Sequence, residues 1–210
     1  MKLYSTVFAE ARAEQEIERS KFITTVRPVN TREEAEEFFS EIRKEFKDAT
    51  HNVPAMVIGD KMQIQWASDD GEPQGTSGAP IVQMLVKEGI TNTALVVTRY
   101  FGGIKLGTGG LVRAYTGSAR LGIEAAGICD VTEMSVIRFR VEYPVFSRIQ
   151  SISLPGGAAV SGEEYTDKVA FDVTCLPEDA EAVKRTVSEH SAGSAEILSE
   201  TADFVRVKRR

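Results

Sequence analysis

The chain has 210 residues, of which 42% are hydrophobic and 27% are charged, and its formal net charge is −6. This composition excludes a disordered chain, and because no apolar run approaches the roughly 18–20 residues of a spanning helix it also excludes a membrane-embedded one. The acidic balance argues against attraction of the whole protein to nucleic acid. Residues 1–6 lack an apolar signal-peptide core, so we expect a cytoplasmic protein with no membrane partner and no DNA specificity.

The first 130 or so residues alternate short strands with amphipathic helices. Strands are predicted at residues 7–9, 22–26, 53–58, 62–67 and 93–98, with the charged residues 14–19 as the turn between the first two. One helix follows the capping box Thr31–Glu34 to about Lys47. A second is capped by the hydroxyl oxygens of Thr76 or Ser77 and ends at Gly89, and a third, rich in small residues, ends near Ala126.

The pattern restarts near residue 131 with strands and helices in the order β-α-β-β-α-β, which is typical of a ferredoxin-like split unit. Its predicted strands are 135–141, 158–161, 168–174 and 195–198, and its predicted helices are 144–152 and 177–193. We therefore expect an α+β protein with two α/β sandwich domains, 1–132 and 133–210. The basic tail 205–210 is expected as a frayed, solvated end, with an RNA-contacting arm as the alternative.

A glycine-rich stretch, residues 98–113, joins the strand at 93–98 to the third helix and holds five glycines in nine residues. Each glycine costs about 0.5–1 kcal/mol of backbone entropy, so the chain here needs positive φ or a close approach. Amides at a helix start favour an anion. The alternative is a tight strand-to-helix crossover packed against the sheet. The candidate phosphate- or RNA-binding residues are Arg99, Tyr100, Gly102, Gly103, Lys105, Gly107, Thr108, Gly109, Gly110 and Arg113.

Charge and aromatic side chains support the anion interpretation of this stretch. Residues 73–123 carry five basic residues and one acidic residue, Glu88, on an otherwise acidic chain. If the strand continues to residue 101, alternation places the rings of Tyr100 and Phe101 on opposite faces, and the exposed ring is the candidate for stacking on a base. The glycine pattern matches neither a Walker loop nor a dinucleotide fingerprint.

An acidic loop with Asp69, Asp70 and Glu72 comes shortly before the glycine-rich stretch. These carboxylates are interpreted as a solvated turn, as partners of Arg99 or Lys105, or as Mg²⁺ ligands beside a substrate phosphate. His51 is expected as a hydrogen-bonded polar residue, because a base needs a nucleophile within reach and none is identifiable. We predict no catalytic residue, no metal site and no cofactor. Cys129 and Cys175 have no metal-type spacing and are expected as buried thiols, with a disulfide between them as the alternative.

Residues 99–107 resemble the signature of the YigZ/IMPACT family, and residues 68–78 and 49–52 resemble two further segments of its bacterial two-domain members. The resemblance covers the whole chain. It implies a first domain with the fold of a ribosomal-protein second domain, and a ferredoxin-like second domain similar to the last domain of elongation factor G. Eukaryotic relatives regulate translation during amino-acid starvation, but through an extra recruitment domain not seen in this sequence.

We therefore expect a cytosolic binding or regulatory protein linked to translation, whose partner is RNA, the ribosome or a translation factor. The alternatives are a Mg²⁺-dependent enzyme acting on a phosphorylated small molecule or nucleotide, and a protein–protein regulator with no phosphate site. The enzyme alternative requires residues 69–72 and 99–113 to line one cleft, and it largely fails if the two segments lie on opposite faces.

Overall fold

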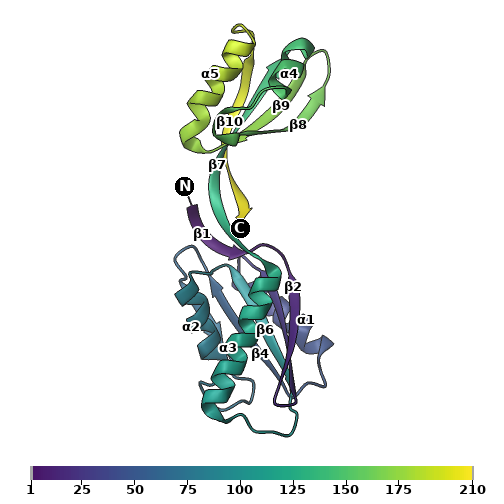
Figure 1. Cartoon of the computed structure of the whole chain (residues 1–210), viewed down its shortest axis with the longest axis vertical. Coiled ribbons are helices and arrows are strands. Elements are labelled where there is room, and N and C mark those ends of the chain that lie inside the picture. The colour runs from purple at the N-terminus through teal and green to yellow at the C-terminus, as the bar shows by residue number, and fades with distance from the viewer. Residues whose placement is uncertain (1, 210) are drawn as a thin grey trace. The chain divides into compact units, whose positions relative to one another are not determined.

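A computed structural model describes residues 2–209 of the chain. The chain divides into two compact units, and we describe each by itself. Residues 3–131 and 206–209 form the first unit, and residue 2 and residues 132–205 form the second. The class is α+β, as predicted (Figure 1).

The first unit is built on an antiparallel sheet with the strand order β2-β3-β6-β4-β5. Its strands are β2 (Ala11–Ile17), β3 (Ser20–Pro28), β4 (His51–Ile58), β5 (Ile64–Ala67) and β6 (Thr93–Tyr100). Its helices are α1 (Arg32–Glu45), α2 (Gly78–Glu88) and α3 (Gly107–Ala126). A further strand, β1 (Lys2–Val7), pairs with β7 (Ile128–Val141) in a second sheet.

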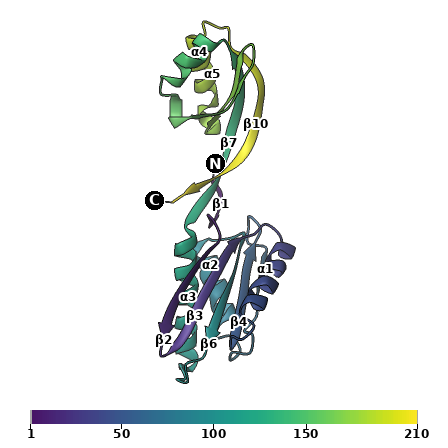
Figure 2. The ribbon, with the colours of Figure 1, turned by 90° about the vertical axis from the view of Figure 1, so that its right-hand side faces the viewer.

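Helices cover both faces of the first sheet: α1 lies on one side, and α2 and α3 lie on the other (Figure 2). On β6 the buried side chains alternate between these layers, so that Ala94 and Val96 pack toward α1 while Leu95 and Val97 pack toward α2 and α3. The same alternation places Arg99 on the α2/α3 face where β6 ends. On β4, His51 lies directly opposite Arg99 in the antiparallel register.

Small side chains let α3 pack closely on the sheet, as its sequence predicted. A Cβ atom at Gly122 would lie 2.5 Å from Cγ2 of Thr24 on β3, and Ala114 and Ser118 on the same helix are buried. Helix α3 is therefore held at a fixed distance from β3, and its first turn reaches the end of the sheet where Arg99 and His51 lie.

The second unit has the ferredoxin-like strand order β8-β9-β7-β10, with β7–β9 and β8–β9 antiparallel. Besides β7 its elements are α4 (Tyr143–Gln150), β8 (Ala159–Tyr165), β9 (Val169–Cys175), α5 (Ala180–His190) and β10 (Glu196–Lys208), with short 3₁₀ turns at Pro155–Gly157 and Pro177–Asp179. Its own buried cluster includes Phe139, Phe146 and Phe171. The predicted order of six elements is confirmed.

Several segments differ from the prediction. The strand predicted at residues 7–9 does not form there, because β1 ends at Val7 and β2 begins only at Ala11. Residues 14–17, expected in a turn, belong to β2, an edge strand whose side chains alternate between half-buried and exposed; only Glu18 and Arg19, with φ of 47° and 64°, make the turn. Charges are tolerated there because an edge strand keeps one face in water. The frayed C-terminal end is wrong as well, because β10 runs to Lys208 and Arg209 donates to Asp130 (2.9 Å). Of the predicted tail, residue 210 lies outside the described residues.

Two further expectations concern the cysteines and membrane-spanning helices. Cys129 and Cys175 are buried free thiols, so the disulfide alternative is wrong. Burial raises the pKa of both thiols. Among residues 2–209, no helix has the length and apolar character needed to cross a membrane.

Candidate functional site

A cavity of about 440 Å³ lies at the end of the first unit where β4 begins and β6 ends. His51 of β4, Glu72 of the acidic loop and Arg99 of β6 line it, together with Phe101 and Lys105 of the glycine-rich stretch. Gly107 and Thr108, in the first turn of α3, line it too. The acidic loop and the glycine-rich stretch therefore meet at one cavity, as the enzyme alternative requires.

The floor of the cavity holds a buried ion pair between Arg99 and Glu72, whose residues are 4% and 8% exposed. Nη1 of Arg99 donates to Oε1 of Glu72 at 2.6 Å, and Nη2 donates to the Ser20 hydroxyl at 3.1 Å. The hydroxyl of Tyr115, on α3, donates to the same Glu72 oxygen at 2.7 Å. Burial raises the pKa of Tyr115 well above its usual value, and the Glu72 carboxylate raises it further, so the phenol stays protonated and keeps donating.

Aromatic rings enclose the guanidinium of Arg99. The ring centres of Phe22 and Phe101 each lie 5.3 Å from its central carbon, a distance that suits a cation–π contact. Phe22 also packs edge-on against Tyr115 in the core. Phe101 is 45% exposed, so its ring is shared between Arg99 and solvent at the cavity.

The hydrogen bonds of His51 fix its tautomer. Its Nδ1 lies 2.8 Å from the carbonyl oxygen of Asp70, and a carbonyl only accepts, so Nδ1 carries the proton of the neutral ring. Nε2 then offers a lone pair, 3.7 Å from Oε1 of Glu72. Gly71, with φ of 87°, makes the turn that brings the Asp70 carbonyl to the ring and Glu72 to the cavity.

The start of α3 offers amide donors to this cavity. Helix α3 has twenty residues, its N-cap is Leu106, and no described side chain accepts a bond from its first turn. Its leading N–H groups and its dipole therefore favour an anion, beside the exposed Lys105. Gly102 has a different role, because a Cβ there would lie 2.0 Å from the backbone oxygen of Arg19. The stretch is thus partly a close-packed crossover and partly an anion-favouring helix start.

Asp69 is a structural residue at the start of α2. Its Oδ1 accepts bonds from the amide and hydroxyl of Ser77 (3.2 and 2.6 Å) and from the amide of Gly78 (2.9 Å), and its Oδ2 accepts from Gly75 (2.8 Å). Burial opposes ionisation, but these bonds outweigh it and lower the pKa of Asp69. The prediction that Thr76 or Ser77 caps α2 is wrong, because the Ser77 hydroxyl donates to Asp69 and the carboxylate does the capping.

The carboxylate of Asp70 is likewise occupied. One oxygen accepts from the amide of Asn52 at 2.6 Å, and the other pairs with Arg43 at 2.7 Å. Of the three loop acids, Glu72 alone lines the cavity. Among the described residues, no group of three or more His, Cys, Asp or Glu side chains has a metal-binding arrangement.

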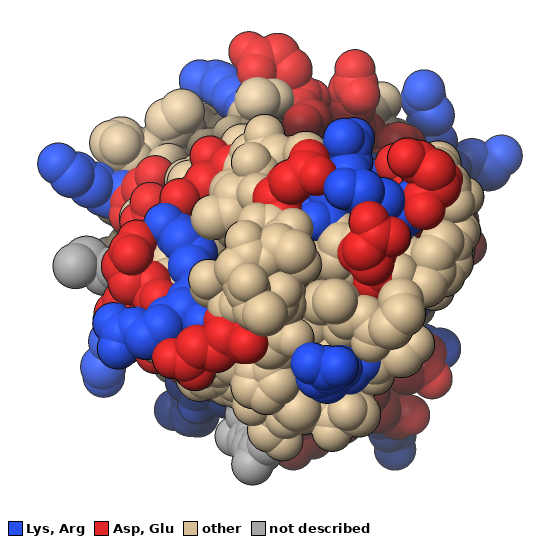
Figure 3. All heavy atoms as spheres, turned by 90° about the horizontal axis from the view of Figure 1, so that it is seen from above, with Lys and Arg blue, Asp and Glu red and all other residues tan. Residues whose placement is uncertain are grey.

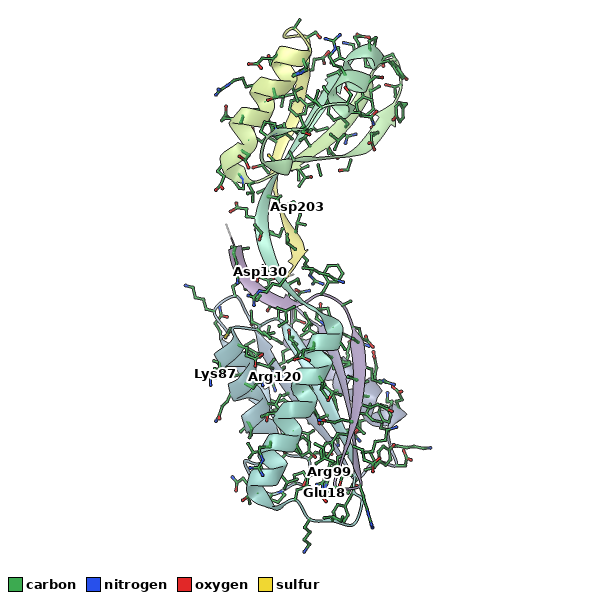
Figure 4. All side chains as sticks on the ribbon, in the orientation of Figure 1. Glu18, Lys87, Arg99, Arg120, Asp130 and Asp203 are labelled. Carbon is green, nitrogen blue, oxygen red and sulfur yellow. The ribbon has the colours of Figure 1, made fainter. Side chains whose placement is uncertain are left out.

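The remaining predicted residues lie outside this cavity. Tyr100 points away, and its hydroxyl donates to Asp48 at 3.0 Å. Gly110 and Arg113 line a neighbouring hollow of about 540 Å³, which shares Lys105 and is also lined by Glu18. Gly103 and Gly109 are exposed in the loop and the first turn of α3. Figure 4 labels Glu18 and Arg99 at the same end of the first unit.

Sequence reasoning missed two features of the site. Tyr115 was not among the predicted site residues, although a buried tyrosine hydroxyl needs a polar partner, and that need is a signal for the bond to Glu72. Thr50 also lines the cavity, and its hydroxyl accepts a bond from the amide of Phe101 at 3.0 Å. That contact joins the start of β4 to the glycine-rich stretch.

A family profile, two bacterial proteins and a solved structure are all similar to this chain. The profile of the Impact N-terminal domain matches residues 18–123. An IMPACT family member of Bacillus subtilis, YvyE, is 37% identical and covers 92% of this chain and 89% of its own. YigZ of Escherichia coli, also an IMPACT family member, is 32% identical over 88% of this chain and 92% of its own. A crystal structure of a hypothetical protein is similar with a TM-score of 0.59 and 30% identity, covering 95% of this chain and 98% of that one.

Proposed function

The chain belongs to the IMPACT family, and we propose that it is a cytosolic regulatory protein that binds RNA of the translation apparatus through the cavity at its glycine-rich stretch. The link to translation rests on the family resemblance. The choice of RNA as ligand rests on the chemistry of the cavity.

One observation supports this choice. The start of α3, which has no side-chain cap, the exposed Lys105 and the exposed ring of Phe101 line one cavity, which is large enough for one nucleotide unit. The α3 amides and Lys105 suit a phosphate, since backbone donors at a helix start and a lysine both favour negative charge. The exposed face of Phe101 suits a base, because every base stacks on an aromatic ring regardless of sequence. Together they fit an unpaired nucleotide of a single-stranded region.

The charge balance of the chain favours a local contact. On the face seen from above in Figure 3, lysine and arginine side chains are interspersed with aspartate and glutamate. A protein of net charge −6 gains little long-range attraction to RNA. We therefore expect few phosphate contacts and a shallow dependence of affinity on salt.

The test is binding of the full chain to a labelled short oligouridylate, followed by fluorescence anisotropy at two salt concentrations. We expect Lys105→Ala to weaken binding and to reduce the slope of log affinity against log salt by about one. Lys87→Ala is the control, because Lys87 is an exposed lysine on α2 that does not line the cavity. Absence of binding at low salt, or binding that ignores salt, contradicts the proposal.

A second candidate is a small phosphorylated ligand or free nucleotide, favoured by the enclosed polar floor formed by Glu72 and Arg99. The Mg²⁺-dependent form of this candidate has only Glu72 of the three loop acids to offer, because the oxygens of Asp69 and Asp70 already accept bonds. A thermal-shift panel of nucleotides with and without Mg²⁺ tests it. Stabilisation by one compound at millimolar concentration favours this candidate over RNA.

A further inference from the structure

We infer that the floor of the cavity is a subsite for the ribose 2′-hydroxyl of the bound nucleotide, with Glu72 or His51 as its acceptor. The inference rests on the proposed RNA-binding function and adds the feature of RNA that the site recognises.

The floor presents polar atoms without partners. Both described bonds to Glu72 end on Oε1, and Oε2 has no hydrogen-bond partner among residues 2–209. Nε2 of His51 is an acceptor that has no donor within hydrogen-bonding distance in the described chain. Nε of Arg99 is a buried donor that finds no acceptor in the same part of the chain. Nε of Arg99 is closed off from the cavity, whereas Oε2 of Glu72 and Nε2 of His51 remain accessible there, so these two acceptors are the atoms that a ligand can reach.

The kinds of unmatched atom select the ligand group. A hydroxyl donates a hydrogen, so it suits the acceptors of Glu72 and His51. An ammonium group only donates and meets the positive charges of Arg99 and Lys105, which also line the cavity. A phosphate only accepts, and at the floor it faces the negative charge of Glu72. In an RNA chain the 3′ oxygen of an internal ribose is esterified, so its 2′-hydroxyl is the donor that Glu72 or His51 accepts.

The mouth of the cavity identifies the carrier of this hydroxyl. The start of α3 and Lys105 suit a phosphate, and Phe101 suits a base, so the group between them is a sugar. A carboxylate side chain that accepts from a ribose hydroxyl is a common solution in nucleotide sites. Because the 2′-hydroxyl distinguishes RNA from DNA, such a floor gives the site a preference for RNA.

Tyr115 holds Glu72 ready for this contact. Its hydroxyl and Nη1 of Arg99 approach the same carboxylate oxygen, at 2.7 and 2.6 Å, which fixes the plane of the carboxylate and leaves Oε2 as the acceptor for a ligand. The Asp70 carbonyl holds His51 in the same way. The acceptors are therefore oriented before the ligand arrives, which reduces the entropy cost of binding.

The experiment compares binding of the full chain to a short oligouridylate, to its 2′-deoxy counterpart and to its 2′-O-methyl counterpart. The 2′-O-methyl sugar keeps the pucker of RNA but lacks the donor hydrogen. We expect the oligouridylate to bind at least about tenfold more tightly than either analogue, since a site built for a hydroxyl discriminates against its loss. His51→Phe should weaken oligouridylate binding and bring the ratio closer to one, whereas Lys105→Ala should weaken all three probes and keep the ratio.

The outcomes separate the two proposals. Equal affinity of the unmodified chain for all three probes overturns the ribose subsite and leaves RNA binding in place. No binding of any probe overturns the proposed function. The comparison of probes needs no variant, so it holds even if His51→Phe fails to fold.

Discussion

Replacing Glu72 with glutamine tests whether the buried ion pair organises the cavity. Glu72→Gln keeps the size of the side chain but removes its charge, so the guanidinium of Arg99, in a residue that is 4% exposed, loses its counter-ion. The Tyr115 hydroxyl can still donate to the side-chain oxygen at position 72, and the Ser20 hydroxyl still accepts from Arg99, but neither group supplies a negative charge. We expect a large loss of stability confined to the first unit.

The distance between the charges sets the magnitude. At 2.6 Å and an effective dielectric constant of about 20 the two charges attract by about 6 kcal/mol, most of which offsets the cost of burying them. Removing one partner of such a pair costs about 3–5 kcal/mol, because the other stays buried without compensation. That is a large fraction of the roughly 5–15 kcal/mol that stabilises a typical domain.

Urea unfolding followed by tryptophan fluorescence measures this loss in the right unit. The one tryptophan of the chain, Trp66, lies on β5 in the first unit and stacks on Phe39 with ring centres 5.9 Å apart. The double variant Glu72→Leu with Arg99→Met removes both charges at similar volume and should recover most of the stability. Glu18→Gln, at an exposed turn, is the control. A cost below about 1 kcal/mol for Glu72→Gln, or a double variant that is as unstable as the sum of its singles, refutes the reasoning.

Three further predictions concern neighbouring residues. Tyr115→Phe should lower the free energy of unfolding by about 1.5–3 kcal/mol at neutral pH, since the lost bond is to a charged group. Burial raises the folded-state pKa of Tyr115, so the phenol stabilises the unmodified chain below its unfolded pKa of about 10 and this stabilisation is lost as the pH rises through the folded value; urea unfolding of the variant should not show that loss of stability at alkaline pH. Asp69→Asn should lower the free energy of unfolding by about 1 kcal/mol at neutral pH through loss of the α2 cap. The folded-state pKa of Asp69 is lowered, so its carboxylate stabilises the fold above the ordinary pKa near 3.8 and this stabilisation is lost as the pH falls through the folded value; the urea unfolding curves of the variant and the unmodified chain should therefore converge in acid. Gly102→Ala should cost more than about 2 kcal/mol, because its Cβ would lie 2.0 Å from the Arg19 carbonyl oxygen, whereas Gly103→Ala, with φ of 87° but open space, should cost only about 1 kcal/mol in the same assay.

Local patterns predicted the elements that carry the site. Alternation was expected to separate Tyr100 and Phe101 if the strand continued to residue 101; β6 ends at Tyr100, but the Tyr100 hydroxyl does bond Asp48 while the Phe101 ring lines the cavity. The glycine-rich stretch and the start of α3 were visible because glycine is costly in a packed element and therefore marks special geometry. These features depend on residues close together in the sequence.

Local patterns reached long-range contacts only in part: the sequence offered Arg99 or Lys105 as partners of the acidic loop, and the structure pairs Glu72 with Arg99, but the details of the pairing depend on the fold. Glu72 and Arg99 are 27 residues apart, and their pairing depends on the register that sets His51 opposite Arg99. Asp69 was a candidate metal ligand because an acidic loop that binds a metal and one that caps a helix can have the same residues. Only the position of α2, whose first amides bond Asp69, distinguishes the two roles. The edge strand β2 was taken for a turn because its exposed charges hide the alternation.

The central claim, that this cavity is the RNA site, is tested most directly by mapping photo-crosslinks. An oligoribonucleotide carrying 4-thiouridine is bound to the full chain, irradiated and digested, and the crosslinked peptides are identified by mass spectrometry. We predict crosslinks within residues 99–113, with Phe101 as the principal site, and lost signal on addition of unlabelled oligouridylate. Crosslinks confined to residues 132–205 would contradict the account, because they place the RNA on the second unit.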